Sequence, residues 1–361
     1  CNGSNGKGFS TFASAISAMQ AGDTIAVRGG TYHQTISFTK SGTSSARLRI
    51  TAYNNETVIV DVAGISNANG ITVGSQKYID IVGLRVRNAP VLGLHAKGAT
   101  DITVTDSEFA YSYHSGLVFE NGARITVTDT LIHHNNTGGL SSWHEAISFV
   151  NVSDFQITGS EVYDNHKEGI DAKYGASGGI ISGNHVYRNN GPNIYIDAAS
   201  DIQISGNTCH ETMGAKACIG LSIESTYNPS HYPTRDVHIY NNVMYGSDAG
   251  IWFWVETADA WAKFENIRIE YNTFVDNTQN SWGGVYFLNG GPQNFGGGNT
   301  IRNNIFFGNS GWAIRGSGSV VQLFTIDHNL FKSGEQSTSF GSSSVVTAAN
   351  PFLNSGAKDF H

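Results

Sequence analysis

The chain of 361 residues has little of several residue types, and each shortage excludes a class of protein. Three cysteines are too few for a disulfide-rich scaffold, and six prolines do not make a proline-rich disordered chain. Charged residues make up only 14% of the chain and the net charge is −8. Such an acidic chain is a poor partner for nucleic acid. Because no run of about 18 apolar residues occurs, we expect no membrane-spanning helix.

Glycine, by contrast, is abundant, with 43 residues, and it marks a repeat. Eight short segments combine a small or polar first residue with alternating apolar and polar positions, and they begin 23 to 34 residues apart. That spacing is typical of a solenoid. The segments begin at Gly93, Gly116, Ala146, Gly169, Asn193, Gly220, Gly250 and Gly284.

A second short strand follows most of these segments, as at 102–105. Connections of a few residues are too short for the helical crossovers of a doubly wound sheet, so parallel strands must stack coil over coil. The sequence therefore predicts an all-β protein, a single-stranded right-handed parallel β-helix. We expect one domain over residues 1–361, with coils over about 24–345.

One helix is predicted, over residues 9–21, where apolar side chains fall on one face. Ser10 is the expected N-cap, and Gly22 is expected to end the helix. A short amphipathic helix ahead of the first coil would cover the open end of the solenoid.

Asparagine recurs at equivalent turns of the repeat. Because amides at such turns can bond to each other from coil to coil, we predict two structural ladders. The first comprises Asn184, Asn207, Asn242, Asn272, Asn304 and Asn329, and the second Asn135, Asn165, Asn189, Asn277 and Asn309.

Residues 168–174 carry ionisable side chains that folding does not require. Strand alternation points Asp171 and Lys173 out of the coil. The segments can be stacked by their first residues. The predicted row then runs through Lys173, Asp197, Glu224 and Trp254, with Tyr195 beside Asp171. We interpret this row as an active site.

Such a row suits β-elimination in a uronic-acid polymer, which needs a base for the C5 proton, an acid for the leaving O4 and a positive charge beside the carboxylate. Lys173 is the candidate base, and Tyr195 or His144 is the candidate acid. Several carboxylates suit Ca²⁺, whose charge would also favour the neutral amine of the base. The candidate calcium ligands are Glu145, Glu168, Asp171 and Asp197. The candidate substrate contacts are Trp143, Glu224, Tyr227, Arg235, Trp252 and Trp254.

Four long connections depart from the short turns elsewhere, and they carry several of the aromatic candidates. They span 136–144, 225–235, 255–264 and 289–299. Insertions that gather on one side of a solenoid usually wall a binding face, and we expect these to do so.

A plainer interpretation of each charged residue is a surface salt bridge. Lys173 among acidic neighbours would then add little stability. We favour function for the whole set because aromatic-rich loops adjoin it. His185, His210 and His238 lie on second strands or their turns and are expected to be solvated rather than ligands.

The chain resembles the right-handed parallel β-helix polysaccharide lyases. Residues 22–32, Gly-Asp-Thr-Ile-Ala-Val-Arg-Gly-Gly-Thr-Tyr, are similar to the opening coil of that family. The order Glu168-x4-Lys173 is similar to the alginate lyase and chondroitinase B group. The resemblance implies that Glu168 binds Ca²⁺ and that Lys173 is the base. That group has an arginine on the next coil, where this chain has Tyr195, a difference that is similar to β-helix alginate lyases with a lysine base and a tyrosine acid.

We therefore expect a secreted or extracellular monomeric enzyme that acts on an anionic polysaccharide, alginate first and pectate next. Cys1 is the candidate site for a lipid anchor, unless it merely starts the chain. Cys209 and Cys218 are close in sequence around one turn, which suits a disulfide or two thiols equally.

Two other functions stay open. Asp171, Asp197 and Glu224 include enough carboxylates for the acid and base of a β-helix glycoside hydrolase. The paired-Asp and Gly-His-Gly motifs of the polygalacturonases are missing, however, and a hydrolase gives Lys173 no role. A non-catalytic glycan-binding β-helix would bind its ligand without depending on Lys173.

Overall fold

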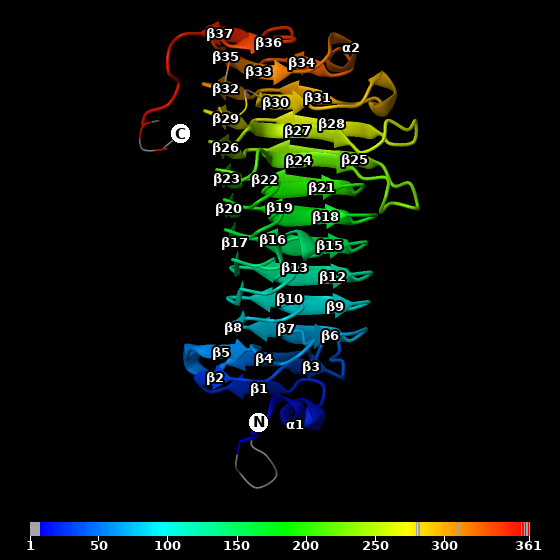
Figure 1. Ribbon diagram of the computed structural model, residues 1–361, viewed down its shortest axis with the longest axis vertical. Helices are drawn as coiled ribbons and strands as arrows, with labels where there is room; N and C mark the ends of the chain where they lie inside the picture. The colour runs from blue at the N-terminus through cyan, green and yellow to red at the C-terminus, as the bar shows by residue number, and fades with distance from the viewer. Residues whose placement is uncertain are drawn as a thin grey trace. The chain divides into compact units, whose positions relative to one another are not determined.

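The computed structural model describes residues 8–278, 280, 282–309, 311–354, 356, 358 and 360 (Figure 1). The chain divides into two compact units, Cys1–Asp171 and Ala172–His361. Each unit consists of coils, and each coil supplies one strand to each of three parallel sheets, here called A, B and C.

The first unit begins with the helix α1 (Phe12–Ala18), which is shorter than predicted at both ends. Thr11, not Ser10, is the N-cap, because its side chain accepts a hydrogen bond from the Ser14 N–H. At the other end, the Lys40 ammonium donates to the carbonyls of Ser17 and Met19, at 2.6 and 2.8 Å. A side chain therefore satisfies carbonyls that a longer helix would bond internally.

The strands of the first unit follow the coil order A, B, C. Sheet A contains β1 (Thr24–Val27), β4 (Leu48–Ala52), β7 (Lys77–Val82), β10 (Thr100–Thr105), β13 (Ala123–Thr128) and β16 (Ser153–Thr158). Sheet B contains β2 (Gly30–Tyr32), β5 (Val58–Asp61), β8 (Leu84–Arg87), β11 (Glu108–Ala110), β14 (Leu131–His133) and β17 (Glu161–Tyr163). Sheet C contains β3 (Ile36–Phe38), β6 (Ile71–Val73), β9 (Leu94–Lys97), β12 (Leu117–Glu120) and β15 (Ile147–Val150). The strand β18 (Ile170–Lys173) includes the border between the units.

The second unit repeats the same order. Sheet A contains β19 (Ser177–Ser182), β22 (Ser200–Ser205), β25 (Thr234–Tyr240), β28 (Phe264–Glu270), β31 (Thr300–Arg302) and β34 (Thr325–Asp327). Sheet B contains β20 (His185–Tyr187), β23 (Thr208–His210), β26 (Val243–Tyr245), β29 (Thr273–Val275), β32 (Ile305–Phe307), β35 (Leu330–Lys332) and β37 (Val345–Thr347). Sheet C contains β21 (Ile194–Asp197), β24 (Ala217–Ile223), β27 (Ala249–Val255), β30 (Gly283–Phe287), β33 (Trp312–Arg315) and β36 (Gln336–Ser337), and the short helix α2 (Gly318–Val321) follows β33.

Apolar side chains that point into the coils form the core, because each lies over its equivalent in the next coil. Ile194 pairs with Ile219, which pairs with Ile251, and all three are fully buried. Such burial contributes roughly 1.5–3 kcal/mol for each large side chain. The predicted all-β parallel β-helix with an N-terminal helix is confirmed. None of the helices in the described part of the chain has the length and apolar character that a membrane span requires.

The asparagine ladder of the second unit is also confirmed. The Asn184 side chain donates to Asn207 Oδ1 at 3.0 Å, and the Asn207 side chain also donates to the Ile181 carbonyl at 2.9 Å. The same side-chain bond joins Asn207 to Asn242, Asn242 to Asn272, Asn272 to Asn304 and Asn304 to Asn329. Of the second set, Asn135 bonds to Asn165 and Asn277 to Asn309, whereas Asn189 bonds to Asn193.

The structure shows the state of the two internal cysteines and corrects the prediction for one histidine. Cys209 and Cys218 are buried thiols and do not form a disulfide. Burial raises the pKa of the Cys209 thiol, and its neighbour Cys218 raises it further. His210, which was expected to be solvated, is instead buried and stacked between Tyr187 and Tyr245, with ring centroids 4.9 and 4.6 Å apart. Sheet B presents aromatic rings on its outer face here, and they cover the imidazole.

Candidate functional site

The base candidate Lys173 lies at the end of β18, on the outer face of sheet C. Ile170 and Ala172 are fully buried in the core, and alternation places Lys173 on the opposite face. Only 6% of Lys173 is exposed. Its ammonium lies 5.3 Å from the centroid of the Tyr174 ring, within the range of a cation–π contact. The Tyr174 N–H donates to the Asp197 carbonyl at 2.9 Å, so the end of β18 lies beside the end of β21, as predicted.

The register of the next coils differs from the predicted row at Glu224. Asp197 pairs with Ser222, and Ser222 pairs with Trp254. Gly220 pairs with Tyr195 rather than with Asn193, the first residue of the preceding segment. The alignment of the segments by their first residues was therefore wrong by two residues. Side chains in a strand alternate with a period of two. A shift of two therefore leaves the inward and outward pattern unchanged, and the sequence gives no sign of it.

Glu224 reaches the site all the same, because it lies one residue beyond β24. Its carboxylate accepts hydrogen bonds from the hydroxyls of Tyr174, at 2.8 Å, and Tyr195, at 3.1 Å. Its N–H donates to Asp197 Oδ1 at 2.8 Å. Glu224 therefore connects residues of three successive coils, and the two oxygen atoms of its carboxylate each hold one phenol.

This cluster is unusually well covered for the outer face of a sheet. Asp197 is fully buried and Tyr195 is only 6% exposed. All residues of β18 and β21 are buried, whereas the outer positions of β9 in the first unit remain partly or fully exposed. Tyr227 contributes part of the cover, with its ring 6.4 Å from that of Tyr174, and it is itself 66% exposed. Polar groups held in a covered site interact more strongly than in water.

Three long connections of the second unit, 225–235, 255–264 and 289–299, all follow sheet C strands and lie side by side, as predicted. The Glu256 carboxylate accepts hydrogen bonds from the Thr226 hydroxyl and N–H at 2.6 and 2.7 Å, and these bonds lower its pKa. The Asn294 side chain donates to the Ala262 carbonyl at 2.8 Å. The connections thus bond to one another and wall one edge of sheet C.

The fourth long connection belongs to the first unit and places His144 beside another carboxylate. His144 Nε2 lies 3.4 Å from Glu120 Oε1, and Lys97 Nζ lies 3.2 Å from Glu120 Oε2. Burial raises the pKa of Glu120, but hydrogen bonds from Lys97 and His95 outweigh it and lower the pKa overall. Trp143 is 40% exposed, with its ring centroid 4.4 Å from that of His144. His144 therefore lies among groups that were not predicted from sequence.

The remaining acidic candidates of the first unit are largely buried. Glu145 is 8% exposed and accepts a hydrogen bond from the Ser148 hydroxyl at 2.8 Å. Asp171 is fully buried, and Glu168 is partly exposed and accepts the Ala146 N–H at its carbonyl. Among the residues that the structure describes, no group of three or more His, Cys, Asp or Glu side chains is arranged to hold a metal ion. The calcium ligands named from the sequence therefore stay a prediction, and we derive no step through a metal.

Three predicted substrate contacts have different environments. Trp254 is partly exposed on the outer face of β27. Trp252 is only 6% exposed and packs against Ala217 and Ala249, so its ring offers little open surface. Arg235 lies in β25 of sheet A, with its guanidinium 3.7 Å from Asp236, and the structure does not bring it to the outer face of sheet C.

Tyr174 was not among the site residues predicted from the sequence. It follows β18 directly, with φ at +51°, a conformation in which a large residue is uncommon. Its position immediately after the candidate base was the available signal. The hydrogen bond to Glu224, 50 residues away, could not be read from the sequence.

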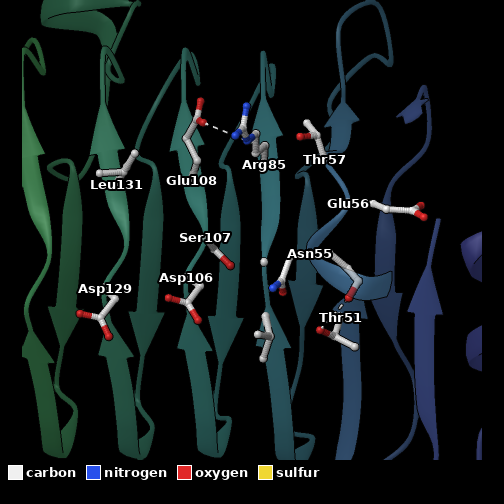
Figure 2. Close-up of a pocket in the computed structure, with 13 residues that line it drawn as sticks. Thr51, Asn55, Glu56, Thr57, Arg85, Asp106, Ser107, Glu108, Asp129 and Leu131 are labelled. Atoms are coloured by element: carbon white, nitrogen blue, oxygen red, sulfur yellow. Dashed lines mark hydrogen bonds and ion pairs between the residues drawn. The ribbon is translucent and has the colours of Figure 1, made fainter. Parts of the chain in front are cut away.

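The first unit also contains a pocket of about 510 Å³ at the turns between sheets A and B. Figure 2 shows Asp106 and Asp129 at equivalent places on neighbouring coils, and Arg85 paired with Glu108, with 3.7 Å between Arg85 Nε and Glu108 Oε2. A hydrogen bond from His133 is the main cause that lowers the pKa of Glu108. No residue predicted for the active site lines this pocket, and we assign it no chemistry.

Comparisons with known proteins agree with this fold. Residues 1–145 match the family model described as "Pel9A-like, right handed beta helix region", and residues 92–262 match "Right handed beta helix region". The chain is 24% identical to the uncharacterized protein YwoF of Bacillus subtilis, over 96% of this chain and 75% of that protein. It is 27% identical to the pectate lyase PEL9 of Emericella nidulans, over 44% of this chain and 43% of that protein. The chain thus spans less than half of PEL9.

Among solved structures, pectate lyase Pel9A superposes with a TM-score of 0.52 at 17% identity, covering 70% of this chain and 74% of that one. The fold also hosts other activities. The family 28 exopolygalacturonase of Yersinia enterocolitica has a TM-score of 0.54 at 12% identity, covering 94% and 72% of the two chains. The surface adhesin PfbA of Streptococcus pneumoniae has a TM-score of 0.57 at 11% identity, covering 93% and 85%. These likenesses establish the right-handed β-helix, and the function has to come from the site.

Proposed function

We propose that this protein is a polysaccharide lyase that cleaves a uronic-acid polymer by β-elimination, with Lys173 as the base. The observation that carries the proposal is a lysine only 6% exposed on the outer face of a sheet, beside a cluster of two tyrosines and a glutamate. Burial of an amine is costly and favours its neutral form, which is the form that accepts a proton.

In the proposed step, the neutral amine of Lys173 takes the proton from C5 of the uronate. The electron pair of the C5–H bond forms the C4=C5 double bond, and the C4–O4 bond breaks. Tyr195 donates its phenolic proton to the departing O4. Exchange with water then removes the proton from Lys173 and returns one to Tyr195, so the enzyme is unchanged after each turnover.

Glu224 has a positioning role in this scheme. Its carboxylate holds the hydroxyls of Tyr195 and Tyr174, at 3.1 and 2.8 Å, and its N–H holds Asp197. Fixing the phenol beside the base brings the acid and the base to one reacting sugar. Such orientation contributes much of the rate in enzymes that transfer protons between fixed groups.

The substrate carboxylate must also be neutralised while the C5 proton leaves. Calcium stays the proposed cofactor, with Glu145, Glu168, Asp171 and Asp197 as proposed ligands. A cation shared between the substrate carboxylate and protein carboxylates does not need a preformed group of three protein ligands, and it would supply Lewis-acid stabilisation of the developing charge.

Two similar proteins, PEL9 and Pel9A, are pectate lyases by name. We therefore propose pectate as the first substrate and place alginate, which the sequence favoured, second. Polymers such as pectate and alginate are cleaved outside cells, so we also propose that the protein is secreted or extracellular. We further propose that it works as a monomer.

The test is the ultraviolet absorbance of the unsaturated uronate, scanned over pectate, alginate, glucuronan and glycosaminoglycans. We expect wild-type protein to release this chromophore from one polymer, and Lys173→Ala to abolish it. Lys263→Ala, in the connection before β28, is the matched control and should keep full activity. Reducing ends without the chromophore would instead indicate a hydrolase, for which Asp171, Asp197 and Glu224 are the candidate carboxyl residues.

A further inference from the structure

Beyond Tyr195, the outer face of sheet C in the second unit continues as a row of aromatic and cationic side chains. Gly220 pairs with Trp252, Trp252 with Tyr286, and Tyr286 with Arg315. Because neighbouring strands lie about 4.8 Å apart, the strands β24, β27, β30 and β33 span about 14 Å along the stack. That spacing per coil is comparable to the length of one sugar unit in a polysaccharide.

The aromatic rings of this row lie against one another, and the ring that the others pack on is nearly buried. The ring of Trp282 lies 5.8 Å from that of Trp252 and 5.5 Å from that of Tyr286, between centroids. Trp252 is nearly buried, whereas Trp282 and Tyr286 are partly exposed. Trp252 therefore supports the other two rings, and they present the open faces.

Cationic side chains flank these rings at both ends. The Lys216 ammonium lies 5.3 Å from the centroid of Trp252, and the Arg315 guanidinium lies 5.2 Å from that of Tyr286. The neighbouring carboxylate, Asp248, is fully buried and accepts hydrogen bonds from the Lys216 N–H and the Asn280 side chain. Asp248 therefore lies below the surface of the row, whereas Lys216 and Arg315 are partly exposed on it.

The row is continuous with the candidate active site because of one glycine. A Cβ atom on Gly220 would lie 2.7 Å from the Tyr195 ring and 2.6 Å from Trp252 Nε1, which is too close for any side chain. The absence of a side chain lets both rings pack over this backbone. Tyr195 of the candidate active site and Trp252 of the row therefore lie next to each other on one continuous surface.

We propose that Lys216, Trp282, Tyr286 and Arg315 form a binding subsite for acidic sugar units next to the bond that is cleaved, an inference that rests on the proposed function. Sugar rings stack on Trp282 and Tyr286, and the carboxylates of the sugars pair with Lys216 and Arg315. A neutral oligosaccharide gives the two cations nothing to pair with. Positive charge at both ends of an aromatic surface therefore selects a polyuronate.

The test measures binding separately from turnover. In a Lys173→Ala background, isothermal titration calorimetry follows saturated tetramers of galacturonate and of mannuronate, with neutral galactotetraose as the uncharged match. Trp282→Leu keeps apolar volume but removes the ring, and Arg315→Gln removes the charge. The matched controls are Tyr271→Leu, an exposed aromatic after β28, and Arg49→Gln, an exposed arginine of β4.

We expect at least one acidic tetramer to bind, the neutral tetramer not to bind, and each of the two row variants to weaken affinity about tenfold, the size of one lost charge-assisted contact. The controls should stay within about twofold of the parent, a difference of under half a kcal/mol. Arg315→Lys should keep most of the affinity, and unchanged thermal unfolding shows that the variants are folded. Equal affinity of parent and both row variants, or equal binding of the neutral tetramer, would overturn the subsite.

The two proposals fail in different ways. If wild-type protein releases no unsaturated product but the tetramers bind through Trp282 and Arg315, the lyase proposal falls and the subsite stands. If wild-type protein cleaves a polyuronate while both row variants bind like the parent, the subsite falls and the lyase proposal stands.

Discussion

The hydroxyl of Tyr195 donates a hydrogen bond to the carboxylate of Glu224 at 3.1 Å, although the two residues lie 29 positions apart and on different coils. The same carboxylate accepts the hydroxyl of Tyr174 at 2.8 Å. Two phenols therefore share one acceptor beside Lys173. Only Tyr195 is the proposed acid, so replacement of each tyrosine in turn should lower the rate of elimination by different amounts.

Tyr195→Phe removes the proposed acid and keeps the ring. We expect kcat on the best polymer to fall about 10²- to 10⁴-fold, the usual loss when a general acid is removed. Tyr174→Phe removes the other phenol that Glu224 holds and should cost less than about tenfold, because orientation of Tyr195 by Glu224 remains. Steady-state rates of unsaturated product formation distinguish the two. Similar losses in both variants would reject Tyr195 as the acid.

Removal of divalent cations tests the calcium proposal. After dialysis against EDTA, we expect the rate of elimination to fall, and added Ca²⁺ to restore it, because the substrate carboxylate then lacks its counter-charge. Calorimetry with Ca²⁺ and the protein alone should give little binding, since the described residues present no group of three ligands. A rate that EDTA leaves unchanged removes calcium from the mechanism.

Gly220→Ala tests how tightly the rings of Tyr195 and Trp252 pack. The added Cβ would lie 2.6–2.7 Å from both, so one ring must move. We expect the free energy of unfolding to fall by about 1–3 kcal/mol, as for other overpacked sites, and kcat to fall with it. Urea unfolding measures the first. Gly297→Ala, where a Cβ meets no atom within 4 Å, is the control and should be nearly neutral. Equal stability of the two variants contradicts the packing.

The stability of the protein should depend on pH through His210. Burial lowers its pKa to about 4, and the positive charges of His185, Arg188 and Lys358 add to the effect. Between pH 6.5 and 4 the unfolded chain therefore binds more protons than the folded one, so acid favours unfolding. From pH 7 to pH 5 this single group should remove about 2 kcal/mol of stability.

Urea unfolding at pH 7 and pH 5 checks the effect of His210. His210→Gln should lose less stability on acidification than wild-type protein does, by about the same 2 kcal/mol. His166→Gln, a change at an exposed histidine, should follow wild type. If His210→Gln shows the full wild-type loss, the buried imidazole is not the cause.

The fold was predictable because its causes are local and repeated. The spacing of the segments, the alternation of apolar residues and the recurring asparagines each act within one coil or between neighbouring coils, and the ladder from Asn184 to Asn329 forms as expected. The helix at the start was found at the right place but predicted too long. Its end depends on Lys40, which reaches the last carbonyls from outside the helix.

The site was predictable only in part. The sequence alone determined that Lys173 ends a strand with its side chain outward and that Asp197 ends the next, because alternation and coil length fix both. Tertiary structure decided that Ser222, and not Glu224, faces Asp197, since a shift of two residues preserves alternation and is settled only by how the strands pair. It also decided that Glu224 returns to the site from beyond its strand to hold two phenols, because that contact depends on the path of a long connection rather than on any local pattern.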